Sequence, residues 1–131
     1  PAIYKKKVFN DIKFDNHITS KMDDTDFCYR LEKLNKFNIG IGKTKIAQDH
    51  YPSIESYKNK FMWYGYGDAQ FAKKFPKKLL NIFYHIAFRY PFSHSLSCLF
   101  RLRYYGLIYC LLHSYYRIIG FFKYFINENK N

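Results

Sequence analysis

The sequence predicts a mixed α/β fold, and three local patterns support that prediction. The opening stretch AIYKKKVF mixes apolar and basic residues as an extended segment does. After Asp24, apolar residues recur at helical spacing. The stretches NIGIG and KTKIAQDH combine β-branched residues with glycines, which indicates two short strands. At 131 residues the chain forms at most one domain with one modest core.

The first elements follow from these patterns in chain order. Residues 1–22 are expected to form a strand and a loop that turns at Phe14 and Asp15. A helix should begin at Asp24 and end near Asn35. Its apolar stripe falls at the i, i+4 and i+7 positions, which are Phe27, Leu31 and Leu34.

A second helix is expected between Ser53 and Pro76. Ser53 is a good N-cap, and Glu55 lies in the first turn, where the helix dipole favours an acid. Gly65 and Gly67 lie inside this helix. Because each glycine costs about 1 kcal/mol relative to alanine in a helix interior, we expect a break or kink there.

Two further helices are predicted in the aromatic and basic C-terminal part. One covers residues 79–90 and stops before Pro91, and the next begins at residues 93–95 and runs towards Ile126.

The apolar run 104–126 is interrupted by His113, Arg117 and Lys123, which argues against a membrane span. An amphipathic helix lying on an anionic membrane fits better, and ordinary helix packing is the alternative.

The net charge of +12 is unevenly distributed. Residues 1–60 carry 12 Lys and Arg against 8 acids, whereas residues 61–131 carry 10 against 2. Such a surface attracts nucleic acid, anionic lipid or phosphorylated substrates. No RNP-like, zinc or helix-turn-helix signature supports nucleic acid. The three cysteines are widely spaced, which does not indicate a disulfide framework and favours the reducing cytoplasm. The sequence opens without the apolar run of a signal peptide.

Three acids stand within four positions, in the stretch DDTDFCYRL. As structural residues, Asp23 completes a capping box with Ser20, Asp24 is an N-cap, and Asp26 pairs with Arg30 at i+4. As a functional group, a carboxylate at a helix start can act as a general base. Spacing alone favours the structural interpretation, because helix caps are common and catalytic carboxylates are few.

His50 has a similar ambiguity. A lone histidine is more often a structural residue, and the neighbouring Asp49 can accept a hydrogen bond from its ring. Imidazole is also a common metal ligand.

The order KKKVF, FD, DDTDFCYRLEK, NIGIG, KIAQDHYPS and KFMWYGYGDAQFAKKFP resembles the second half of a family 2 glycosyltransferase. The resemblance covers roughly residues 2–76. In that family a loop ending in FDE precedes an acidic motif of the form EDTDLCYRL. A strand pair, a histidine and a YGxGD-like helix follow it.

This resemblance implies a GT-A nucleotide-diphospho-sugar transferase fold and inverting transfer from a nucleotide-sugar to a glycan or lipid-linked acceptor. Asp24 would be the general base and Asp23 would support it. His50 would help hold a divalent metal, Mg or Mn, at the departing diphosphate. Trp63 and Tyr64 would lie near the acceptor, and core packing of their helix is the alternative.

The sequence also departs from the family pattern. FDE is FDN here, and neither a nucleotide-binding half nor a DxD acid pair precedes Pro1. We therefore expect residues 1–76 to be the C-terminal part of such a domain, with little activity in isolation. Residues 77–131 would form a basic aromatic tail docked on the cytoplasmic membrane face. The alternative is a non-enzymatic basic module that binds anionic lipid or nucleic acid.

Overall fold

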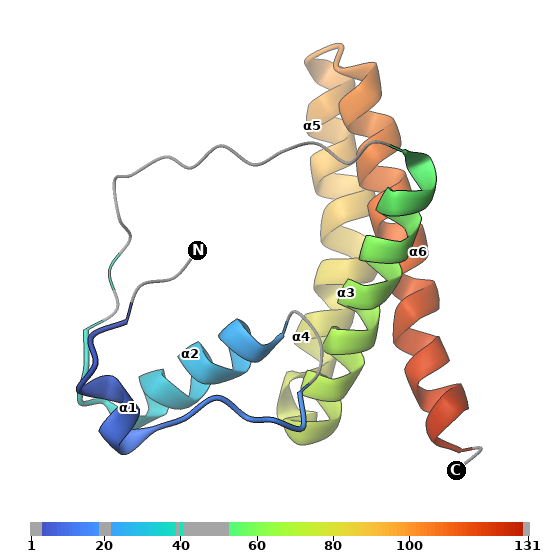
Figure 1. The fold of residues 1–131 in the computed structure, drawn as a ribbon. Coiled ribbons are helices and arrows are strands. Elements are labelled where there is room, and N and C mark those ends of the chain that lie inside the picture. Colours follow the sequence, from blue (N-terminus) through green and yellow to red (C-terminus); the bar gives the residue numbers. More distant parts are fainter. Residues whose placement is uncertain (1–3, 19–21, 39, 41–52, 130–131) are drawn as a thin grey trace.

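The computed structural model describes residues 4–18, 22–38, 40 and 53–129, and all regular structure in these ranges is helical (Figure 1). The elements are α1 (Val8–Asp11), α2 (Asp23–Leu34), α3 (Ile54–Lys74), η1 (Pro76–Lys78), α4 (Leu79–Tyr84), η2 (His85–His94), α5 (Ser95–Phe100) and α6 (Tyr104–Glu128).

The predicted α/β fold, and with it the GT-A-like fold, is wrong for the described residues, because none of them forms a strand. The opening segment shows the reason. Tyr4, Val8 and Ile12 are four residues apart, which is helical spacing, and they pack against Phe27 and Leu31 of α2. The two strands expected over 38–50 lie almost entirely outside the described residues.

Helix α2 is confirmed close to its predicted limits. It ends at Leu34, and Asn35 follows in the left-handed conformation with φ 51°. Asparagine tolerates that conformation better than most residues, so it is a suitable helix end. Phe27 and Leu31 are buried as the apolar stripe predicted, whereas Leu34 is exposed.

Helix α3 is also confirmed, with Ser53 as its N-cap. The Ser53 hydroxyl accepts a hydrogen bond from the backbone nitrogen of Ser56 at 3.1 Å. The predicted break at the glycines is wrong, because α3 runs unbroken from Ile54 to Lys74. Gly65 instead lies where the backbone of α6 crosses α3, and Gly120 of α6 lies against Met62 in the same crossing.

The predicted helix end before Pro91 is wrong as well. Helices α4, η2 and α5 form one continuous rod through Pro91, with wide π-type turns in η2. Proline has no backbone N–H to donate, and a π-type segment is where such an irregularity is accommodated. The rod ends at Phe100, so the helix predicted from 93–95 to Ile126 is two helices. Leu102 makes the turn between them with φ 52°.

Helices α3, α6 and the rod pack side by side (Figure 1). Their core contains Ala69, Ala72, Ile86 and Phe121. The two predicted segments, 1–76 and 77–131, therefore share a core through α3 and α6. Within the described residues, no helix is both long enough and apolar enough to cross a membrane.

Candidate functional site

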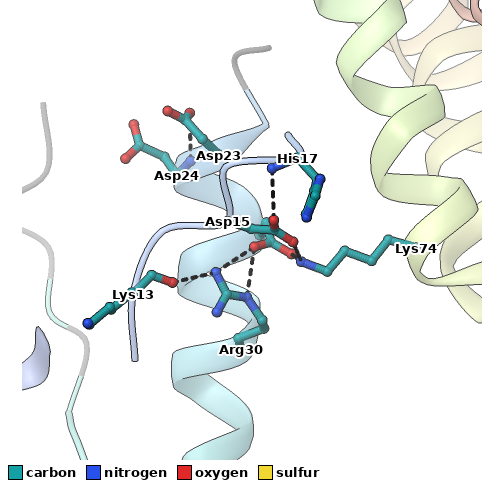
Figure 2. A network of polar contacts seen from close by, with 8 residues as sticks. Lys13, Asp15, His17, Asp23, Asp24, Arg30 and Lys74 are labelled. Atoms are coloured by element: carbon teal, nitrogen blue, oxygen red, sulfur yellow. Dashed lines mark hydrogen bonds and ion pairs between the residues drawn. The ribbon is translucent and has the colours of Figure 1, made fainter. Parts of the chain in front are cut away.

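The acids of DDTDFCYRL have different environments, and Asp26 is the structural one. Its side chain is 0% exposed and forms ion pairs with Arg30 at 2.7 Å and Lys74 at 2.6 Å (Figure 2). The predicted pairing of Asp26 with Arg30 is confirmed. Arg30 also donates to the backbone carbonyl of Lys13 at 2.9 Å, so one arginine ties α2 to the preceding loop.

Lys74, at the end of α3, holds two acids from the N-terminal part. Besides Asp26 it contacts Asp15 at 2.6 Å. The bond from Lys74 and a second one from the backbone of His17 hold the pKa of Asp15 below its usual value. The FD segment and α2 are therefore fixed against the same end of α3, with Tyr29 packing on the ring of Phe75.

Asp23 and Asp24 make no such ion pairs with the described residues. The N-cap of α2 is Met22, without a side-chain cap, so the prediction of Asp24 as N-cap is wrong, and Ser20 lies outside the described residues. Asp24 is exposed, and its side chain makes no hydrogen bond or ion pair with another described residue. Among the described residues, Asp23 accepts one bond, from the backbone nitrogen of Asp24 at 2.8 Å.

Figure 2 shows this acid pair on the side of α2 away from Lys74. The charges of the pair affect the pKa of Tyr4. Burial raises the pKa of its hydroxyl, the bond to the Cys28 thiol adds to this, and the charges of Asp24 and Asp23 raise it further.

A cavity of about 500 Å³ lies between α2 and the three-helix core. Its lining residues are Met22, Thr25, Cys28, Tyr29, Glu32, Asp68, Phe71, Lys78, Asn81, Ile82, His85 and Arg117. Neither Asp23 nor Asp24 is among them. The acid pair therefore belongs to a helix that lines the cavity, but the two acids do not line it themselves.

A second buried carboxylate, Asp68 of α3, pairs with Arg117 of α6. Arg117 donates from Nη2 to Asp68 Oδ1 at 2.8 Å and from Nε to Oδ2. Burial raises the pKa of Asp68, and the bonds from Arg117 oppose that rise. His113 lies beside the pair, with Nε2 3.4 Å from Nη1 of Arg117. No local signal links Asp68 to Arg117, because 49 positions separate them.

The two residues assigned to the acceptor by resemblance lie in different places. Trp63 is 46% exposed and lines a groove of about 380 Å³ where α3 crosses α6. Tyr64 is partly buried and packs between Phe61 and Arg117. Only Trp63 is therefore placed to contact a ligand in that groove.

The predicted metal site stays a prediction. His50 lies outside the described ranges. Within them, three or more His, Cys, Asp or Glu side chains nowhere gather as a metal site requires.

The outer side of the rod carries a row of unpacked apolar side chains, the apolar row, spaced four residues apart. Each is at least 51% exposed: Leu80, Tyr84, Phe88, Phe92, Leu96 and Phe100. Neighbouring rings stack along it, with centroids 6.3 Å apart for Tyr84 and Phe88 and 6.0 Å apart for Phe88 and Phe92. Monomeric soluble proteins rarely expose so continuous an apolar surface.

Three features thus qualify as candidate sites: the acid pair with its exposed Asp24, the Trp63 groove and the apolar row. In comparisons with known proteins, the chain matches no protein-family profile, no curated protein and no solved structure.

Proposed function

We propose that this chain works on an anionic membrane surface, where the apolar row docks it, and that it takes part there in sugar transfer from a nucleotide-sugar to a glycan or lipid-linked acceptor. The observation that supports docking best is the apolar row itself. It runs along the outside of the rod, where no described helix covers it. An amphipathic surface of this kind binds in the plane of the lipid headgroups.

The charge around the apolar row favours anionic lipid over a neutral partner. Between residues 69 and 127 the sequence has nine Lys and Arg and no acid. Arg89 and Arg101 each follow a phenylalanine of the apolar row directly. Each basic side chain near an anionic membrane contributes about 1 kcal/mol, so the apolar and electrostatic contributions act together.

Replacing Phe88 and Phe92 together by glutamate is expected to reduce the vesicle-bound fraction about tenfold or more, because it removes apolar area and adds repulsion from anionic lipid. Co-flotation with phosphatidylglycerol and phosphatidylcholine vesicles measures this fraction. Ile54→Glu is the control, since Ile54 is an apolar residue more exposed than Phe88 and Phe92 but lies outside the apolar row. Equal flotation of the Phe88/Phe92 variant and the unmodified chain would contradict docking, as would equal binding to neutral vesicles.

The acid pair supports sugar transfer. Asp24 is exposed at the start of a helix that Asp26, Arg30 and Lys74 hold in place. Its carboxylate neither caps α2 nor pairs with a described cation. A carboxylate without a structural task, on a fixed helix, is available to accept the proton of an attacking hydroxyl. In this proposal Asp24 is the general base, and Asp23 supports it.

Asp24→Asn is expected to slow sugar transfer by a factor of about 10² to 10⁴, the usual contribution of a general base. The assay follows incorporation of labelled sugar from a panel of nucleotide-sugars into membranes of cells that express the intact gene product. Glu55→Gln is the control, because Glu55 is likewise an exposed acid in the first turn of a helix. Transfer at an undiminished rate by the Asp24 variant, or no transfer from any donor, rejects the proposed role and leaves lipid docking alone.

A further inference from the structure

We propose that the groove where α3 crosses α6, lined by Trp63 and Lys123, binds a saccharide that carries a carboxylate or phosphate group. This inference deepens the proposed sugar transfer by naming the chemistry of its acceptor, and the choice of ligand rests on that function. The groove is lined by Asn59, Met62, Trp63, Tyr66, Gly120, Lys123 and Asn127.

The groove is built from two helices at close range. Asn59, Trp63 and Tyr66 stand at the i, i+4 and i+7 positions of α3, so they share one face. Lys123 and Asn127 are four residues apart on α6. The two faces meet at the floor of the groove because Gly120 has no side chain there. A methyl group on it would collide with the backbone carbonyl of Met62.

The side chains match a sugar ring. The half-exposed indole of Trp63 offers a flat apolar surface on which the C–H face of a pyranose can pack. The amides of Asn59 and Asn127 each provide both donors and an acceptor, which suits neighbouring hydroxyl groups. A mostly apolar lining with a few polar groups that fix orientation is typical of ligand sites.

The charge of the groove selects an acidic sugar. No acid is among the lining residues, and Lys123 is exposed without an ion pair to any described residue. The nearby Glu128 is engaged by Lys73. A lysine ammonium binds a carboxylate or phosphate through charge-assisted hydrogen bonds, which are stronger than neutral ones.

The groove is a holding site, not a reaction site. Helix α2, with the acid pair, packs against the C-terminal end of α3, where Tyr29 contacts Phe71 and Phe75, whereas the groove residues of α3 lie between positions 59 and 66. A bound saccharide in the groove would therefore be a part of the acceptor chain remote from the transferred sugar.

The single tryptophan of the chain lies in this groove, so its fluorescence reports binding directly. Titrating the intact chain with trigalacturonate is expected to give a saturable change in emission, with maltotriose as the neutral counterpart. Lys123→Gln should weaken trigalacturonate binding about tenfold, the loss of one charge-assisted bond. Lys58→Gln is the control, since Lys58 is an exposed lysine of α3 outside the groove.

No emission change with trigalacturonate, equal affinity for maltotriose, or unchanged binding by the Lys123 variant would overturn the inference. Full displacement of the sugar by millimolar inorganic phosphate would show a site for a small anion only, which also overturns it. Binding is measured without a nucleotide-sugar, so it is independent of Asp24. Loss of transfer in Asp24→Asn with groove binding intact separates the two proposals.

Discussion

Alanine in place of Gly65 is expected to lower the free energy of unfolding by about 3 kcal/mol or more, the upper range for overpacking a close contact. The added methyl group would meet the backbone carbonyl of Arg117 and would lie 2.8 Å from the backbone nitrogen of Phe121. Both neighbours are main-chain atoms of α6 and cannot rotate away. Relief therefore requires α3 and α6 to separate, which loosens the core around Ala69 and Phe121.

Urea denaturation followed by far-UV circular dichroism measures this loss. Gly40→Ala is the control, since no described residue lies within 4 Å of the methyl group it would add, and its effect should stay within about 0.5 kcal/mol. Gly120→Ala should resemble Gly65→Ala, because its methyl group would collide with Met62. The double variant should lose less stability than the sum of the two single losses, because one separation of α3 and α6 makes room for both methyl groups. Unaltered stability of Gly65→Ala would mean that the helices do not cross this closely.

Methionine in place of Arg117 is expected to cost about 3 to 5 kcal/mol, because it leaves the Asp68 carboxylate buried without its partner. The guanidinium makes two bonds to that carboxylate, whose side chain is only 2% exposed. Lys73→Met is the matched control. It also breaks an ion pair, with Glu128, but both groups are exposed, so the unfolding midpoint should barely move.

The cost of Arg117→Met should depend on pH. Burial raises the pKa of Asp68, and losing Arg117 removes the main opposing influence, so the pKa rises further in the variant. A carboxyl with a raised folded-state pKa binds protons more tightly when folded, so stability increases as the pH falls through that pKa. The deficit should therefore be smaller at pH 5 than at pH 8. Adding Asp68→Leu should recover much of the loss, and failure to recover it would show that the pair is not the cause.

The elements that sequence analysis predicted well are those with local signals. Helix α2 follows from the spacing of Phe27 and Leu31, and the start of α3 follows from Ser53. The pairing of Asp26 with Arg30 spans one helical turn, so neighbouring positions suffice to predict it.

Several of the failures share a cause, which is contact between distant positions. From the sequence alone, Gly65 is expected to weaken its helix. The structure shows why a glycine is needed there, because the backbone of α6 leaves no room for a side chain. In the sequence Tyr4 and Val8 are consistent with a strand. Only the folded chain shows that they pack against Phe27 and Leu31. Likewise, Asp68 and Arg117 have no recognisable relation in the sequence, and Trp63 gains Lys123 as a neighbour only in the folded chain. The catalytic role of Asp24 stays a prediction.

The wide turns of η2 determine the shape of the surface that the rod presents. In an α-helix, with about 3.6 residues per turn, a step of four residues overshoots one revolution, so a row at that spacing winds around the axis. In a π-helix, whose bonds span five residues, the same step falls short of a revolution and the row winds the opposite way. Because η2 lies between α4 and α5, the winding of the row in η2 offsets its winding in the two α-helices. Leu80 and Phe100 therefore stay in phase, and a flat boundary can meet both ends of the row at once.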